Sequence, residues 1–276
     1  MLIRATKAHV LFLLKRRSAQ ITFALLFAVV LLRFVVDVLE FRGYDVIAMY
    51  HPMKLLSLSY NHIYYNANTV ILLSQLFPLL VAFPAGLSLA ADQGSGAQTV
   101  LLARLGPRRY TASKILAVII ATAILFTLPF LMEVVLNCIA FPLQATGDMS
   151  NLNIYDPQYI AMTDRYWLPE LYHFSPYLYA VVGILRFGLF AGLLAGFTAA
   201  LSTFIRIKYR VFLLLPVFLL LFYSISLEDV SLRWYNYALL FADEPKNHLF
   251  GAGLYVLPAV FCLLAVLCSG WKDYRR

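Results

Sequence analysis

Residues 115–141 read ILAVIIATAILFTLPFLMEVVLNCIAF, and Glu133 is the single charged residue among them. This run is longer than a helix of a soluble core needs and exceeds the roughly 20 apolar residues that a helix requires to cross a bilayer. The whole chain of 276 residues has the same character, with 62% hydrophobic residues, 13% charged residues and a mean hydropathy of +0.78. The sequence therefore predicts an integral membrane protein and excludes a soluble enzyme, a secreted scaffold and a disordered chain.

Further apolar windows of about 20 residues accompany this one. The complete set is residues 19–38, 69–90, 115–141, 177–205, 211–227 and 251–270. The polar stretches between them are too short for a soluble module of about 50 residues. We expect an all-α integral membrane fold, one domain over residues 1–276 with six transmembrane helices. Prolines inside several windows, such as Pro84 and Pro129, favour local kinks.

Charged residues divide unevenly among the connections. Most of the 22 Lys and Arg lie at the two termini, in the loop that ends at Lys114 and in the loop at residues 206–210, while most of the 14 Asp and Glu lie in the other connections. The positive-inside rule then places both termini in the cytoplasm. The net charge of +8 reports this topology and not a nucleic-acid partner. The expected location is the plasma membrane, in a bacterium.

The segment before the first window has its own pattern. Residues 2–14 mix apolar positions with Arg4 and Lys7 and lead into Lys15-Arg16-Arg17. This pattern suits a helix at the inner membrane interface, in contact with lipid. Two roles stay open for it: a basic anchor that fixes topology, or an elbow packed on the bundle.

Four ionisable residues fall within the windows: Arg33, Asp37, Glu133 and Arg186. Each needs a partner or water at that depth. The rise of about 1.5 Å per residue places Arg33 and Glu133 at similar depths, where they could pair. Glu133, Arg186 and Arg33 are candidates for a transport path. The alternatives are snorkelling for Arg33 and buried structural pairing for Glu133 and Arg186.

The fourth window carries a stripe of small residues, Gly188, Gly192 and Gly196, at four-residue spacing. Such a stripe lets another helix approach closely. That helix belongs either to the same chain or to a second subunit.

The cysteine and histidine patterns predict neither a disulfide nor a metal site. Cys138, Cys262 and Cys268 lie in or beside apolar windows, so no pair in a polar loop suggests a disulfide. The histidines of the connections show no ligand spacing within an acidic cluster.

The loop between the second and third windows, residues 91–114, reads ADQGSGAQTVLLARLGPRRYTASK. Ser95 and Gln98 fit a capping box, and Gly106-Pro107 fits a left-handed stop, so a helix of about nine residues is expected. Its apolar stripe needs a partner surface. This is either the bundle itself or a groove in a cytoplasmic protein. The stripe consists of Ala97, Val100, Leu101 and Leu105.

In this loop the chain resembles the six-span permease subunits of type-two ABC transporters, most of which are exporters. In that family an acidic residue ends the second span, a glycine-containing turn leads into a coupling helix, and an Arg-x-x-x-x-Lys-like stretch opens the third span. The matching residues here are Asp92, Gly94 with Gly96, Gln98 to Leu105, and Arg109 with Lys114. Asp92 stands where the family more often has Glu, and Gly96-Ala97-Gln98 replaces a more polar run. The wider resemblance covers nearly the whole chain.

The resemblance implies a permease domain that hydrolyses nothing itself, with its coupling helix in a cleft of a separate cytoplasmic ABC ATPase subunit. ATP and Mg belong to that partner, and no cofactor is expected in this chain, which has no Gly-x-x-x-x-Gly-Lys-Ser/Thr loop. Two permease domains enclose one path, so a homodimer or a sister permease is implied. The residues implied for ATPase coupling are Asp92, Gly94, Ser95, Gln98, Leu101, Arg104, Leu105, Arg108 and Arg109.

Two other classes stay open. A six-span channel or a membrane scaffold, such as an immunity or assembly factor, would share the spans but would not need the doubly marked helix. An integral membrane enzyme would need a nucleophile or a metal constellation, and neither His-Glu-x-x-His nor Gly-x-Ser-x-Gly occurs. For a transporter, the aromatic and weakly charged connections are compatible with an amphipathic small molecule, peptide or lipid as cargo.

Overall fold

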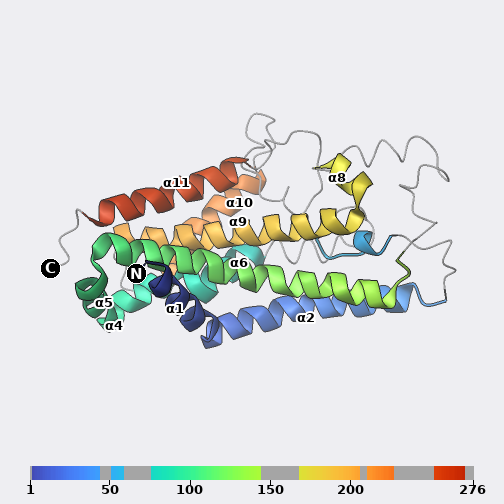
Figure 1. Ribbon diagram of the computed structural model, residues 1–276, viewed down its shortest axis with the longest axis horizontal. Helices are drawn as coiled ribbons and strands as arrows, with labels where there is room; N and C mark the ends of the chain where they lie inside the picture. The colour runs from blue at the N-terminus through green and yellow to red at the C-terminus, as the bar shows by residue number, and fades with distance from the viewer. Residues whose placement is uncertain are drawn as a thin grey trace.

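The computed structural model describes residues 2–43, 51–58, 76–143, 168–205, 210–226 and 252–270. Within these ranges every element of regular structure is helical. Figure 1 shows the longer helices side by side along the long axis of the molecule. For the described part of the chain, the all-α prediction is confirmed.

Among the described residues, three helices are long and apolar enough to cross a membrane: α2 (Arg17–Glu40), α6 (Pro107–Ala140) and α9 (Pro176–Phe204). With 24, 34 and 29 residues and a rise of about 1.5 Å per residue, each exceeds the roughly 30 Å of a hydrocarbon core. By their length and composition, these helices are those of a membrane-embedded protein.

A fourth span exists if a bent pair of helices counts as one. The stretch Leu76–Gly86 ends in a π-helical turn, η3 (Ala82–Gly86), and is followed at an angle of 45° by α4 (Ser88–Ser95). Pro84 lies in this turn and has no backbone N–H to donate, so the regular ladder of hydrogen bonds is broken there. The kink expected at Pro84 is thus present.

The last two windows form shorter helices in the described residues. They contain η4 (Arg210–Leu213) with α10 (Leu214–Ser226), and α11 (Ala252–Ser269). The 13 residues of α10 extend about 20 Å, which is less than a bilayer core. The chain between them, residues 227–251, lies outside the described residues. Six spans therefore stay a prediction.

The core centres on α6 and α9, which contact each other and α11, while α1 and α2 also pack on α6. Phenylalanine rings of the two long helices pack around the ring of Phe77. Phe77 stacks on Phe190 of α9 at 5.7 Å between ring centroids and meets Phe126 of α6 edge-on at 5.8 Å. These rings are buried, so they hold the second window against the α6–α9 pair.

Helix α6 of the same chain lies against the glycine stripe of α9. A Cβ atom on Gly188 would collide with Thr127 Oγ1, one on Gly192 would lie 2.5 Å from the backbone oxygen of Ile119, and one on Gly196 would lie 2.7 Å from Ile119 Cγ1. Of the two arrangements that the sequence leaves open, the structure shows the one within a single chain.

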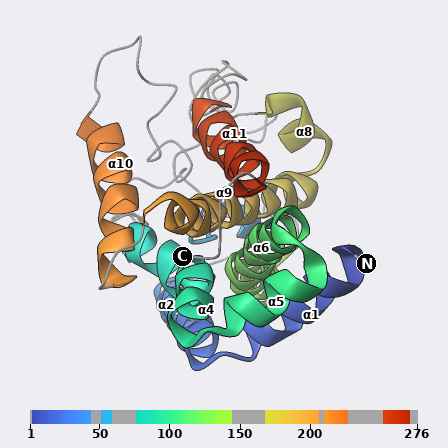
Figure 2. The same ribbon diagram turned by 90° about the vertical axis from the view of Figure 1, so that its left-hand side faces the viewer.

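The N-terminal helix α1 (Leu2–Leu14) lies across one end of the bundle, as the end-on view in Figure 2 shows. Thr6 and Leu13 are buried, and the helix packs on α6. Arg4 and Lys7 remain exposed. The helix is thus packed on the bundle in the manner of an elbow.

Candidate functional site

A helical hairpin projects from the same end of the bundle as α1 (Figures 1 and 2). It consists of α4 and α5 (Ala97–Leu105), and Gly96 turns the chain between them with φ +73°. A left-handed residue of this kind favours glycine, because a side chain is strained there. The nine residues of α5 confirm the short helix expected from the sequence.

The predicted start of this helix is wrong in detail. Helix α4 continues through Gly94 and Ser95, and Gly96, not Ser95, occupies the cap position of α5. Ser95 is therefore not at the N-cap position that the predicted capping box requires, because a single left-handed glycine ends one helix and begins the next. No separate polar cap or loop lies between α4 and α5.

The end of α5 is confirmed at Gly106. Its N–H donates to the carbonyl oxygen of Leu102 at 2.9 Å. Its φ of 75° is positive, a conformation that favours glycine, while its ψ of 155° differs from that of a left-handed helical residue. Pro107 then occupies the first turn of α6, where its missing N–H costs nothing. One glycine alone thus separates α5 from the long helix α6.

The surface of α5 is largely open. None of its residues is buried, and Val100 in the apolar stripe is 58% exposed. Leu101 and Leu105 are half-buried, so part of the stripe faces the protein itself. The basic residues Arg104, Arg108 and Arg109 are exposed.

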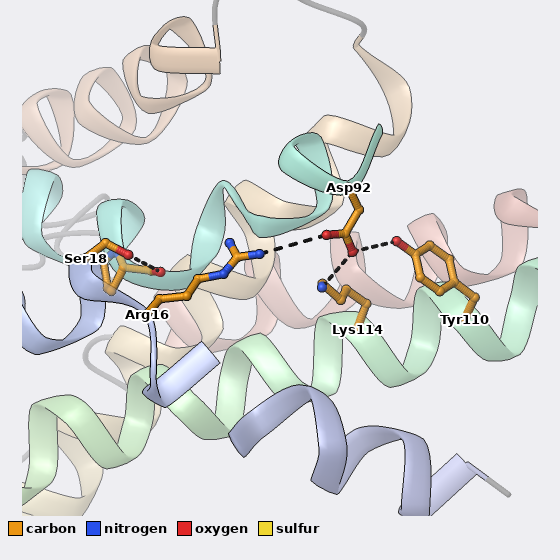
Figure 3. Close-up of polar contacts among 6 residues, drawn as sticks. Arg16, Ser18, Asp92, Tyr110 and Lys114 are labelled. Carbon is orange, nitrogen blue, oxygen red and sulfur yellow. Dashed lines mark hydrogen bonds and ion pairs between the residues drawn. The ribbon is translucent and has the colours of Figure 1, made fainter. Parts of the chain in front are cut away.

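The base of the hairpin is held by a buried ion pair. Lys114 Nζ of α6 lies 2.7 Å from Asp92 Oδ2 of α4, and the hydroxyl of Tyr110 donates to the same oxygen at 3.0 Å (Figure 3). Tyr110 and Lys114 are one helical turn apart, so both side chains face α4. Asp92 is 7% exposed and Lys114 is 1% exposed.

Two residues that precede α4 in the sequence, Arg16 and His9, also contact the group formed by Asp92, Tyr110 and Lys114. Arg16, at the junction of α1 and α2, lies 3.9 Å from the other oxygen of Asp92, and its longer, partly exposed contact contributes less than the Lys114 pair. The ring of His9 on α1 meets the ring of Tyr110 edge-on. Burial, helped by the nearby Lys114 and opposed by Asp92, lowers the pKa of the His9 imidazole. His9 is therefore neutral around pH 7.

Two further hydrogen bonds join the bent span to its neighbours. Ser18 Oγ of α2 donates to the carbonyl oxygen of Pro84 at 3.2 Å (Figure 3), and Gln93 Nε2 of α4 donates to the carbonyl oxygen of Ser202 on α9 at 3.1 Å. Together with the Asp92 pair, they fix the base of the hairpin to α2, α6 and α9. The tip of the hairpin, α5, has no buried residue.

Sequence reasoning found Asp92 but missed its partners. It assigned Arg16 to membrane topology, counted Lys114 for topology and matched it to the family's Arg-x-x-x-x-Lys-like stretch, and gave no role to Tyr110. A signal was present, because Tyr110 and Lys114 stand four residues apart at the start of an apolar window, and Asp92 is one of few acids on the basic side of the chain. A buried lysine at such a position needs a carboxylate partner.

The transport-path candidates Arg33 and Glu133 have other partners than expected. Arg33 forms an ion pair with Asp37 on the same helix at 2.5 Å. Glu133 Oε1 accepts hydrogen bonds from the backbone N–H and the hydroxyl of Ser57, at 2.8 and 2.7 Å. These contacts stand in place of the suggested pair of Arg33 with Glu133. Residues 51–58 fold against α6, so that Ser57 supplies both hydrogen-bond donors to Glu133.

The third path candidate, Arg186 of α9, is half-buried. Its backbone oxygen accepts a hydrogen bond from the hydroxyl of Tyr255 on α11 at 3.5 Å. The surroundings of Arg186 thus include α11, whereas Arg33 and Glu133 lie on α2 and α6.

Comparison with family models, with curated proteins and with solved structures finds no match for this chain. Among the described residues, no group of three or more His, Cys, Asp and Glu side chains is placed to hold a metal ion. The function must therefore be inferred from the residues themselves.

Proposed function

We propose that the chain is the membrane-spanning permease subunit of an ABC transporter, driven by a separate ATPase subunit that binds ATP and Mg. The observation that carries this proposal is the α4–α5 hairpin. Its base is held in the bundle by the buried Asp92–Lys114 pair, while α5 has no buried residue. An exposed apolar helix between two spans is suited to docking in the groove of another protein.

The connections of α5 suit the transmission of a movement into the membrane. At its C-terminal end, Gly106 alone precedes α6, and at its N-terminal end Gly96 alone follows α4. A displacement of α5 by a closing ATPase would therefore move α4 and α6 together. The Asp92–Lys114 pair keeps these two helices in register.

Charge supports a cytoplasmic partner on this end. Arg104, Arg108 and Arg109 are exposed around the hairpin and give the partner a basic rim to recognise. By the positive-inside rule the same residues support a cytoplasmic location of the hairpin. The partner's cleft is expected to be apolar at its centre and acidic at its edge.

A second permease, as a homodimer partner or a sister chain, would complete the path, and export is the proposed direction. The cargo class is an amphipathic small molecule, peptide or lipid. The apolar spans, with few buried charged residues, support this class; Arg33, Asp37 and Glu133 are among those residues.

The proposal is tested by purifying the tagged chain from its native membrane in a mild detergent. We expect a nucleotide-binding subunit to copurify, identified by mass spectrometry, with ATP hydrolysis that vanadate inhibits. A chain that is reproducibly recovered alone would contradict the permease proposal and favour a channel or a scaffold.

Replacement of Val100 by aspartate should weaken the ATPase complex at least tenfold while the amount of protein in the membrane stays unchanged. Val100 is 58% exposed, so the free chain tolerates the charge, whereas an apolar groove does not. A tenfold loss of affinity corresponds to about 1.4 kcal/mol. The measurement is the ATPase recovered per permease after affinity purification.

Thr99→Asp is the matched control, because Thr99 is exposed on α5 but lies off the apolar stripe. It should leave the recovery of the ATPase unchanged. Equal recovery with Val100→Asp and with the unaltered chain would show that α5 does not dock through its stripe.

A further inference from the structure

Residues 51–58 lie inside the bundle at the end opposite the hairpin. They include η2 (Pro52–Lys54), which contacts α6 and α9 and appears in Figure 1 as a short blue turn between these helices. Met53, Leu55, Leu56 and Ser57 are buried. A connection between two spans normally runs over the surface, so this burial calls for a reason.

Two side chains of α6 hold both ends of this segment. Near its start, Asn137 Nδ2 donates to the carbonyl oxygen of Pro52 at 3.1 Å. Near its end, Glu133 Oε1 accepts the two hydrogen bonds of Ser57. Glu133 and Asn137 are one helical turn apart and each is 1% exposed, so a single buried face of α6 makes both attachments.

Apolar side chains also pack the segment against α2. Leu55 is buried with Phe141, and Phe34 and Phe41 pack against this pair. The ring of Phe141 meets those of Phe34 and Phe41 edge-on, at 6.4 and 6.3 Å between centroids. Residues 51–58 thus fill the space between α2, α6 and α9 at this end.

Two buried oxygens of the side chains that hold the segment lack a hydrogen bond. Glu133 Oε2 and Asn137 Oδ1 are buried, and neither accepts a hydrogen bond from the described residues. A buried acceptor without a hydrogen bond destabilises the arrangement that leaves it so. The closed arrangement is therefore stable through its contacts but carries a cost that water would relieve once the segment moves away.

We propose that residues 51–58 are a plug that closes the outer end of the bundle and leaves Glu133 and Asn137 during the transport cycle. The proposal rests on the proposed function, which places this end outside the cell. Glu133 and Asn137 are positioning residues: they hold the plug and, once it leaves, their oxygens line the opening.

The attachment is tested by labelling a cysteine in the plug with a membrane-impermeant maleimide on intact cells. Met53→Cys is the reporter, since Met53 is buried and its side chain takes no part in the bonds to α6. The native cysteines Cys138, Cys262 and Cys268 are first replaced. Phe174→Cys, at a position 81% exposed, is the accessible reference.

We expect the Met53→Cys reporter to react at least tenfold more slowly than the Phe174→Cys reference. Adding Glu133→Ala should raise its rate at least tenfold without changing the rate of the reference. Glu133→Gln keeps an acceptor oxygen for Ser57 and should leave the reporter protected. A reporter that stays protected with Glu133→Ala overturns the attachment. A rise with both variants overturns it too, provided that gel filtration shows both to be folded.

The movement is tested in the purified complex with its ATPase, reconstituted in vesicles. ATP turnover should increase the labelling of the Met53→Cys reporter relative to the nucleotide-free complex, while the Phe174→Cys reference stays constant. Hydrolysis that proceeds with no change in the reporter overturns the plug. Absence of any ATPase overturns the proposed function and the transport role of the plug with it, whereas the attachment is judged by the cell labelling alone.

Discussion

Replacement of Lys114 by methionine is expected to remove most of the folded protein from the membrane. Methionine fits the space of the lysine stem but leaves the Asp92 carboxylate, 7% exposed, without the cation 2.7 Å away. Removing one partner of a buried ion pair costs about 3–5 kcal/mol. This is a large share of the roughly 5–15 kcal/mol that stabilises an ordinary domain. The measurement is the monodisperse fraction after detergent extraction, together with its Tm.

Two further variants test whether the unpaired Asp92 carboxylate causes the loss of folded protein. Asp92→Asn combined with Lys114→Met removes both charges while the asparagine oxygen can still accept from Tyr110, so most of the folded protein should return. Arg16→Met should change the Tm little, because the Arg16 contact is longer and partly exposed. If Lys114→Met alone matches the unaltered protein, the ion pair does not hold the hairpin.

The second large effect is expected for Gly192→Leu in α9. A Cβ atom at this position would lie 2.5 Å from the backbone oxygen of Ile119, and a backbone atom moves only with its whole helix. The α6–α9 contact must then open along its length. Overpacking of a core costs about 1–3 kcal/mol or more, and alanine at this position should already reach that range. Leucine should abolish recovery of folded protein.

Gly183→Leu is the matched control on the same helix. A Cβ atom at Gly183 meets nothing within 4 Å, so this variant should be recovered like the unaltered chain. The readout is again the monodisperse fraction in detergent. Equal recovery of Gly192→Leu and Gly183→Leu would contradict the close approach of α6 to the glycine stripe.

The parts of the fold that follow from local chemistry could be predicted from the sequence. The spans that become α2, α6 and α9 are continuous apolar runs, and Gly106-Pro107 ends α5 where expected. The start of α5 was not predictable in this way. Whether Ser95 caps a helix depends on whether the preceding residues are already helical, and α4 continues to Ser95.

For the candidate site, too, single residues could be predicted from the sequence but their partners could not. Asp92 and Glu133 stand out because a carboxylate near or within an apolar window needs a partner. Their partners are set by tertiary contacts, as Tyr110 is 18 residues from Asp92 and Ser57 is 76 residues from Glu133. Depth along the helices suggested Arg33 for Glu133, but it does not show which connection folds back into the bundle.

Helix α6 is one continuous rod between the two ends of the molecule. Its 34 residues run through Pro129, so the helix is not broken at the position where the sequence predicts a kink. From Lys114 to Glu133 the rod measures about 28 Å, so a tilt of about 6° about Lys114 displaces Glu133 by about 3 Å. This displacement equals the length of a hydrogen bond. A small rotation applied beside the hairpin would therefore be amplified by leverage into the loss of the hydrogen bonds between Glu133 and Ser57 at the opposite end of the molecule.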